Sequence, residues 1–327
     1  MNNDDHKHLN WRPLSKYALA KRRAQKIALI RNYFQENKVL EVNTPILSTS
    51  AVSDINIESI NTNLSINPSE EFYLQTSPEF FMKRMLADGF KDIFQICKVF
   101  RDDELGRLHL PEFTMIEWYR LNFNLKNIIN DALGIIMLTI NNQYPNIPVE
   151  KISYRDAFLK YLNIDPVTAD TEKIIILANL DTSLQLKMDN DRNQYLDFLF
   201  ATRIAKNFKQ RELTVIHHYP ADQGALARIC PNNNDLADRF EIFFGNVELA
   251  NGYVELTDIQ ETKKRFQNDQ QLRRNQGKKI RPLDENFIAS IEFGLPDCAG
   301  VALGFDRLLM ISEGEANIQS VQHFISK

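Results

Sequence analysis

The sequence predicts an α+β fold in which an antiparallel sheet is flanked by helices. Strand-like runs at 92–101 and 112–120, separated by a charged turn, predict a long hairpin, and 239–255 predicts further strands. Helical periodicity at 16–37 and after Gly304 places helices on both sides of these strands in the chain. The chain has no internal repeat, low-complexity tract or Pro/Gly-rich linker, so one domain is the simplest organisation.

The first predicted helix, 16–37, carries an apolar stripe that includes Ile30 and Phe34. Basic residues lie beside that stripe and are expected to face solvent: Lys21, Arg22, Arg23 and Lys26. A short strand is expected at 39–42, stopped by Thr44 and Pro45.

Ser77, Pro78 and Glu79 form a helix start, because serine caps, proline suits the first turn and glutamate favours the positive N-terminus. That helix should run over 79–87 and end at Gly89. Residues 145–191 are the least regular part of the chain and are expected to form an inserted helical segment. The remaining expectations are helices at 124–142, 257–275, 284–293 and 305–313, and strands at 213–219 and 299–304.

Composition indicates a globular protein whose core is large enough to be stable without disulfide bonds. The chain has 327 residues, of which 43% are hydrophobic and 25% charged. Its three cysteines, Cys97, Cys230 and Cys298, are far apart and lack paired metal spacing. They are expected to be reduced thiols in a cytosolic protein, not a disulfide framework or a zinc site.

Charge and hydropathy favour a cytoplasmic protein. Residues 1–10 are polar and contain no apolar core of a signal peptide, and the longest apolar stretch, 132–140, is too short to span a bilayer. The net charge is −4 and the pI about 5.9, whereas a dedicated nucleic-acid binder usually has a basic face. Local basic patches remain compatible with these totals.

The predicted hairpin offers a nucleotide site, although the chain has no GxxxxGK[ST] loop and no strand-linked GxGxxG. Arg101 ends the first strand and Phe113 lies on the returning one. An arginine there can grip a phosphate with two parallel hydrogen bonds, and a phenylalanine can stack on a flat base. Taken singly, Arg101 fits a surface ion pair and Phe113 a core position equally well.

A second group lies in the stretch 248–255. Strand alternation places Asn251, Tyr253 and Glu255 on one face, while Gly252 permits a close backbone approach. Carboxylates in a mostly apolar strand need a metal, a lysine or a cationic ligand as partner, and Glu248 begins this stretch. A salt-bridged sheet surface is the alternative.

A third group, 300–307, is a strand that turns into a helix at Gly304. Small residues here let a ligand lie against the backbone. Arg307 in the first helical turn opposes the helix dipole, which suggests that it holds an anion or covers a base. An ordinary surface ion pair would also place an arginine there.

Together these segments resemble class II aminoacyl-tRNA synthetases. FRDDELGRLHLPEF resembles motif 2, GVALGFDR motif 3, and VLEVNTPIL, with Pro45, motif 1, the dimer-interface strand. TSPEFFMKRML, PEFTMIEWYR and VELANGYVELTD resemble the lysyl branch, and the likeness runs from about residue 16 to the end. No counterpart of that branch's amino-terminal anticodon-binding barrel is present, and with PDCAGVALG this is similar to the elongation factor P–(R)-β-lysine ligase family.

The resemblance implies a flexible N-terminus at 1–15 and a catalytic domain at 16–327. It implies ATP, Mg²⁺, a homodimer, and elongation factor P as partner, with tRNA and membranes not expected. Its ATP-binding residues would be Arg101, Asp102, Asp103, His109, Phe113, Glu248, Leu249, Gly304 and Arg307, of which Arg101 and Arg307 would be catalytic. Mg²⁺ would be held by Glu241 and Glu248. The site for (R)-β-lysine or lysine would contain Ser77, Pro78, Glu79, Glu117, Tyr119, Asn251, Glu255 and Ala302.

Within that set, Glu79 and Glu117 would take the backbone amine, and Tyr119 and Glu255 the distal ammonium. Asp103 stands where the family has glutamate and Leu110 where relatives have asparagine. Ala302 replaces a glycine of lysyl-tRNA synthetases, as in the protein-ligase branch. Two alternatives stay open: a truncated synthetase acting on RNA, and a non-catalytic module that binds an amino acid.

Overall fold

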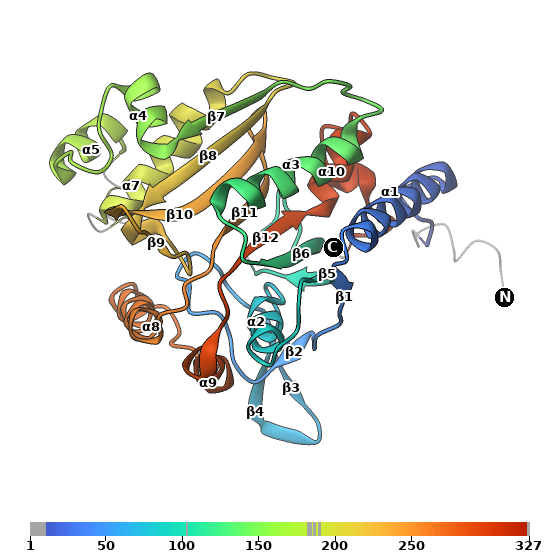
Figure 1. Ribbon diagram of the computed structural model, residues 1–327, viewed down its shortest axis with the longest axis horizontal. Coiled ribbons are helices and arrows are strands. Elements are labelled where there is room, and N and C mark those ends of the chain that lie inside the picture. The colour runs from blue at the N-terminus through green and yellow to red at the C-terminus, as the bar shows by residue number, and fades with distance from the viewer. Residues whose placement is uncertain (1–10, 103, 182–184, 186–187, 189–190, 326–327) are drawn as a thin grey trace, which may run out of the picture.

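Nine strands form the main sheet in the computed structural model, which describes residues 11–102, 104–181, 185, 188 and 191–325 (Figure 1). Their order is β1-β5-β6-β12-β11-β10-β8-β7, with β9 added beside β10. The β1–β5 and β7–β8 pairs are parallel and the other pairs are antiparallel. The strands are β1 (Leu40–Glu41), β5 (Ile93–Phe100), β6 (Glu112–Leu121), β7 (Val149–Ser153), β8 (Leu213–Pro220), β9 (Ile229–Cys230), β10 (Asn233–Phe244), β11 (Val247–Val254) and β12 (Cys298–Gly304).

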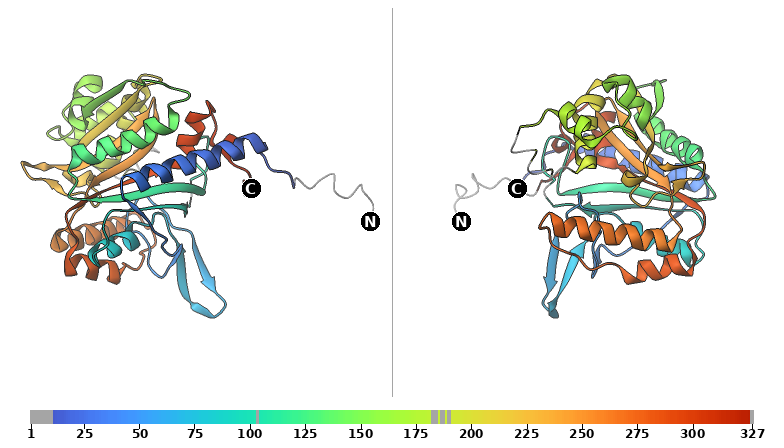
Figure 2. Two further views of the ribbon diagram at one scale, coloured as in Figure 1. Left: turned by 45° about the vertical axis from the view of Figure 1, so that its right-hand side comes forward. Right: turned by 90° about the vertical axis from the view of Figure 1, so that its left-hand side faces the viewer.

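Helices cover both faces of this sheet. Helices α1, α3 and α10 lie on one side, and α2, α8 and α9 on the other (Figures 1 and 2). The helices are α1 (Tyr17–Glu36), α2 (Glu79–Ala87), α3 (Leu125–Ile140), α4 (Tyr154–Leu162), α5 (Thr171–Ala178), α7 (Arg192–Leu199), α8 (Ile259–Asn275), α9 (Glu285–Gly294) and α10 (Phe305–Ser312). A π-helical turn, Phe200–Ile204, extends α7, and short 3₁₀ turns lie at Ala205–Asn207, Ala221–Gln223 and Ile318–Val321.

Alternate residues of the strands enter different cores, which locates the functional face. On β6, Trp118 packs with α1, α3 and α10, whereas Tyr119 packs with α2 and α9. At the other end of the second face, Ile216 and Phe243 pack with α4, α5 and α7. Two apolar clusters therefore occupy the ends of this face, and polar side chains line its middle.

A small separate sheet, absent from the sequence expectations, follows β1. Its strands are β2 (Leu47–Ser48), β4 (Asn67–Leu74) and β3 (Asn61–Leu64), in that order. The β3–β4 hairpin projects away from the body of the molecule (Figure 1). Its exposed and polar residues lack the apolar alternation that identified the other strands.

Several sequence expectations are confirmed and two are wrong. Helix α2 has the expected bounds, and the 92–120 hairpin is β5–β6. The segment 145–191 contains strand β7 as well as helices, and β7 forms the edge of the main sheet. The basic residues of α1 do not all face solvent: Arg23 pairs with buried Asp306 at 2.6 Å, and Lys26 donates to the Thr139 carbonyl.

The start of the described chain lies against its end. The Leu14 amide donates to the His323 carbonyl at 2.8 Å, and Ser15 Oγ contacts His323 Nδ1. Over the described residues, none of the helices combines the length and the apolar character needed to cross a bilayer.

Candidate active site

Three neighbouring strands align polar residues across the middle of the second face. Ala302 on β12 pairs with Asn251 on β11 and with Glu117 on β6. One step away, Gly300 pairs with Tyr253 and with Tyr119 in the same way. Residues far apart in the sequence thus form two adjacent rows on one face.

Glu117 is a fully buried carboxylate held by two hydroxyls. Ser77 Oγ donates to Glu117 Oε2 and Tyr119 Oη donates to Glu117 Oε1, both at 2.6 Å. Burial raises the pKa of Glu117 to about 7, and the negative charge of Glu79 adds to the rise. Ser77 Oγ also accepts from the Glu79 amide at 3.1 Å. The N-cap of α2 is Pro78 and not Ser77 as expected, so Ser77 joins the site from the turn that precedes the helix.

Lys83 lies between two more carboxylates of the site. Its Nζ is 2.5 Å from Glu79 Oε1, one helical turn away, and 2.5 Å from Glu255 Oε2 beyond the end of β11. Tyr253 Oη donates to the same Glu79 oxygen at 2.5 Å. Burial opposes a charge on Lys83, but the charges of Glu255 and Glu79 outweigh it and raise the pKa of this lysine.

Glu255 has capacity for a further cation. Burial raises its pKa to about 8, Lys83 opposes the rise, and the charges of Glu79 and Glu117 add to it. Its Oε1 atom is buried and has no hydrogen-bond partner among the described residues. A Cβ at Gly300 would lie 2.6 Å from this oxygen and 2.4 Å from Tyr119 Cε1, so only glycine fits at this position.

The turn after β5 carries the first part of the predicted nucleotide site. The Arg101 guanidinium lies 5.4 Å from the centre of the Phe113 ring, and its Nη1 is 3.4 Å from Glu104 Oε1. Arg101 Nε is buried and has no hydrogen-bond partner in the described part of the chain. An anion beside Arg101 would satisfy this donor.

Arg307 joins the same turn to β11. Its Nε donates to the Leu108 carbonyl at 3.1 Å and its Nη1 to the Glu248 carbonyl at 3.0 Å. Burial and the positive charge of Arg307 lower the pKa of the adjacent His109. A Cβ at Gly304 would lie 3.8 Å from Arg307 Cδ and 3.8 Å from the Leu249 carbonyl oxygen, so this position has room for a side chain.

Glu241, with its side chain 13% exposed, is the less exposed member of the predicted metal pair. Arg239 Nη2 donates to Glu241 Oε1 at 2.6 Å, and Arg239 Nε donates to Asn251 Oδ1 at 3.3 Å. Burial raises the pKa of Glu241 to about 7; Arg239 opposes this, while the nearby charge of Glu248 adds to it. The side chain of Glu248 is 42% exposed, so one carboxylate of the pair is accessible to solvent. Such a pair fits a hard divalent cation.

The chain matches a known family over nearly all of its length. The sequence model described as tRNA synthetases class II (D, K and N) covers residues 3–327. The chain therefore belongs to the class II tRNA synthetase family.

Three relatives are similar in length as well as in sequence. All are named elongation factor P–(R)-β-lysine ligase: those of Photorhabdus laumondii (40% identity), Avibacterium paragallinarum (41%) and Pseudoalteromonas translucida (41%). Each alignment covers 96% of this chain and 97% of the relative.

The structure gathers most of the residues that the class II resemblance named. The substrate set lies on the β6–β12–β11 face and at the start of α2, and the nucleotide set surrounds Arg101 and Arg307. The Asp102 amide donates to the Glu58 carbonyl at 2.8 Å, and Asp103 lies outside the described residues. In this structure Phe113 faces Arg101, whereas the resemblance pairs it with Arg307 around a base.

Sequence reasoning missed Lys83, Arg239 and the contact of Tyr253 with Glu79. Lys83 stands four residues after Glu79 in the predicted helix, a spacing at which two side chains meet. Arg239 stands two residues before Glu241 on a strand and so shares its face. Both spacings were available signals.

Proposed function

We propose that this class II enzyme activates a lysine-like amino acid with ATP and transfers it to a lysine side chain of elongation factor P. The observation that carries the proposal is a charge imbalance in the buried pocket. Three carboxylates, Glu79, Glu117 and Glu255, lie near Lys83, which pairs with Glu79 and Glu255 and is the cation that the described residues place among them. Two further positive charges would balance them, and lysine or β-lysine brings two ammonium groups.

Geometry supports a division of roles within the pocket. Oε1 of Glu255, which has no hydrogen-bond partner among the described residues, would accept from the distal ammonium beside Tyr119. Glu79 and Glu117 would hold the other amine, and Asn251 would orient the carboxylate. Ala302 lies in register with both Glu117 and Asn251, so its methyl group would shape the end that holds this amine. We infer a preference for (R)-β-lysine over lysine, in keeping with the names of the relatives.

The nucleotide would lie along the turn after β5. Arg101, with its buried Nε, would hold the α-phosphate, and Arg307 would cover the adenine and reach towards the γ-phosphate. The other ATP-binding residues would be Asp102, Asp103, His109, Phe113, Leu249 and Gly304. Glu241 and Glu248 would hold Mg²⁺, which would supply neutralisation of phosphate charge. Arg101 and Arg307 act by positioning and charge stabilisation, and no enzyme nucleophile is required.

The chemistry takes two steps. The substrate carboxylate attacks the α-phosphorus, which gives an acyl-adenylate and releases pyrophosphate. A neutral lysine ε-amine of the acceptor then attacks the acyl carbon, AMP leaves, and the amine proton passes to solvent. We propose a cytoplasmic homodimer as the working form, as expected for a class II enzyme that acts on a translation factor.

The experiment that tests the acceptor uses two competing substrates. The full chain is incubated with ATP, Mg²⁺ and labelled lysine or (R)-β-lysine, together with either purified elongation factor P or total tRNA. We expect one added lysyl mass on one lysine of the factor, faster with (R)-β-lysine. Charged tRNA with an unmodified factor would instead support a synthetase-like enzyme acting on RNA. Binding of the amino acid without ATP–pyrophosphate exchange would support a non-catalytic module.

A further inference from the structure

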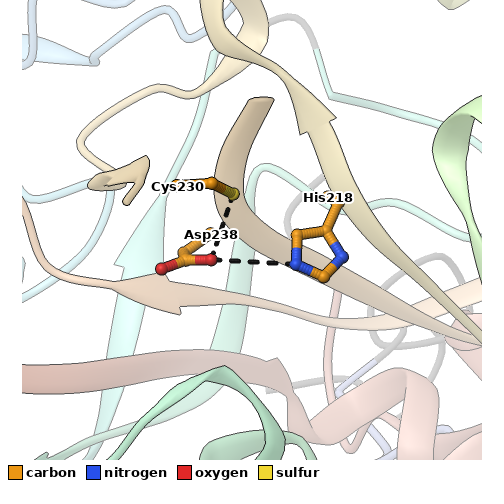
Figure 3. A group of neighbouring side chains, drawn as sticks. All are labelled: His218, Cys230 and Asp238. Carbon is orange, nitrogen blue, oxygen red and sulfur yellow. Dashed lines mark hydrogen bonds and ion pairs between the residues drawn. The ribbon is translucent and has the colours of Figure 1, made fainter. Parts of the chain in front are cut away.

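A second group of polar side chains, separate from the candidate active-site residues, converges where β8, β9 and β10 meet. His218 on β8, Cys230 on β9 and Asp238 on β10 each direct one donor atom inward, and the three donor atoms lie within 4.8 Å of one another (Figure 3). Cys230 Sγ is 3.2 Å from Asp238 Oδ1, and His218 Nε2 is 3.8 Å from the same oxygen. The sequence spacing of the cysteines predicted no zinc site, because these ligands meet only after three strands have paired.

The two separations that involve Asp238 Oδ1 lie close to those of tetrahedral coordination. Metal bonds of about 2.0–2.3 Å to nitrogen, oxygen and sulfur place neighbouring ligand atoms roughly 3.3–3.7 Å apart. These separations, 3.2 and 3.8 Å, bracket that range, and all three donor atoms lie within 4.8 Å of one another, so side-chain adjustment would bring them to a common ion. Each ligand comes from a different strand, and Asp238 lies where the pairing of β10 with β8 shifts register between Ala237 and Phe240.

Neighbouring groups already orient two of the ligands. Arg228 Nη2 holds Asp238 Oδ2 at 2.8 Å, so Oδ1 points towards Cys230 and His218. His217 Nδ1 lies 2.6 Å from His218 Nδ1, which leaves Nε2 of His218 on the side of the cluster. Partners of this kind fix ligand orientation in metal sites. His218 also adopts φ 56°, a left-handed conformation that is uncommon outside glycine.

Burial and access fit a site with three protein ligands and one open position. Cys230 and Asp238 are 7% and 6% exposed, whereas the His218 side chain is 38% exposed. A cavity of about 280 Å³ adjoins all three, lined also by Ser153, Asn232 and Leu236. Water can reach the fourth coordination position from this cavity.

We propose that His218, Cys230 and Asp238 bind a thiophilic divalent cation, of which Zn²⁺ is the type. A thiolate and an imidazole favour zinc over calcium or magnesium, which prefer oxygen ligands only. Binding forms the sulfur–metal bond and releases the thiol proton to solvent. Asp238 directly precedes Arg239, the residue that holds Glu241, so the ion would clamp three strands beside the active site without taking part in the reaction.

The test is metal titration of the chelator-treated full chain with Zn²⁺ and Co²⁺. We expect one ion per chain, an intense near-ultraviolet thiolate-to-cobalt band, and a higher melting temperature with zinc. Cys230→Ser should abolish the band and weaken zinc binding roughly a hundredfold or more, since even an outer partner is worth 10–100-fold. Cys97→Ser, at a thiol outside the cluster, is the matched control and should change neither.

Two outcomes would overturn the proposal. One is cobalt binding without the thiolate band, which would place the ion elsewhere; His6 and His8 are alternative ligands, and the first ten residues contain no cysteine. The other is zinc affinity that Cys230→Ser and Asp238→Asn leave unchanged, which would reduce the cluster to a thiol–carboxylate hydrogen bond. Circular dichroism of each variant confirms that it is folded.

Discussion

Lys83 Nζ lies 2.5 Å from Glu79 Oε1 and 2.5 Å from Glu255 Oε2, so one buried ammonium joins helix α2 to the end of strand β11. The side chains of Lys83 and Glu255 are each 1% exposed, so protein charges and not water balance this pair. The lysine therefore both stabilises the fold and sets the charge that a substrate meets.

Replacing Lys83 by methionine should damage stability and substrate activation together. Removing one partner of a buried ion pair costs about 3–5 kcal/mol of unfolding free energy, because the remaining charge stays uncompensated. Urea unfolding measures the loss, and ATP–pyrophosphate exchange measures activation. Lys263→Met, at an exposed pair with Glu292 (3.8 Å), is the control and should change stability by under about 0.5 kcal/mol. Equal effects of the two substitutions would contradict a central role for Lys83.

Substrate binding should release protons near neutral pH. The pKa of Glu117 is raised to about 7 and that of Glu255 to about 8, so in the ligand-free protein these carboxyls retain protons well above their ordinary value of 4.5. A bound ammonium favours the ionised forms, so affinity should rise as pH increases from about 6 to 8. Calorimetry at pH 7 in buffers of different ionisation enthalpy counts the released protons.

The same two carboxyls give the ligand-free protein the opposite pH dependence. The folded state binds more protons than the unfolded state between pH 4.5 and 8, so their contribution to stability is complete at the acidic end and is lost as pH rises through the raised pKa values. For the substrate-binding prediction, identical apparent binding enthalpies in all buffers would show that substrate binding displaces no proton from Glu117 or Glu255.

Glu255→Gln should weaken binding of the lysine-like substrate without weakening binding of ATP. The change keeps the shape of the side chain but removes a charge, and truncating one partner of a buried charge pair costs about 2–5 kcal/mol. We expect this loss in the affinity for lysine-like substrates, with ATP binding nearly unchanged. Glu112→Gln, at an exposed pair with Lys98, is the matched control. An equal loss of ATP affinity would move Glu255 to the metal site.

Local patterns predicted the parts of the fold whose partners are near in sequence. Ser77 and Pro78 predicted the start of α2, and the alternation around the charged turn predicted β5–β6. The hairpin β3–β4 was not predicted from the sequence, because its exposed polar residues show no periodic apolar pattern. Arg23 was expected in solvent, but it reaches Thr114 and Asp306, and no local pattern reveals partners that are 91 and 283 residues away.

The site was predicted more through motifs than through spacing. From residue chemistry alone, Arg101 and Glu255 could equally have formed ordinary ion pairs. The family resemblance assigned both residues to the active site. Neither source predicted the cluster at Cys230, because its ligands His218 and Asp238 come together only through pairing of β8, β9 and β10.

Arg101→Ala should slow activation. Its guanidinium would stabilise the charge that develops on the α-phosphate, and removing one such donor lowers the rate roughly a hundredfold or more. ATP–pyrophosphate exchange at saturating substrate measures the change. Arg155→Ala breaks an exposed pair with Asp165 (2.6 Å) far from this turn and should leave exchange intact. Undiminished exchange in the Arg101 variant would remove this residue from the phosphate site.

The β1 edge of the main sheet, opposite the edge formed by β7, carries the last prediction. Strand β1 ends the sheet, and Leu40 on it is 56% exposed. Between β1 and α1 lies a hollow of about 620 Å³, lined by residues that include Ala28, Val39 and Phe94. Charged side chains, Arg31 and Glu41 among them, line this hollow together with the apolar ones. A hollow of this kind beside an edge strand suits a two-fold contact with a second copy of the chain, the assembly that motif 1 implies.

Leu40→Lys should therefore shift the protein from dimer to monomer, because it places a charge at the centre of that contact. Sedimentation equilibrium at micromolar concentration distinguishes the two masses. Ile66→Lys is the control, since Ile66 is 91% exposed in the β3–β4 hairpin, away from β1. A monomer mass for the unsubstituted chain would refute the dimer, and a dimer that persists in the Leu40 variant would move the contact to another surface.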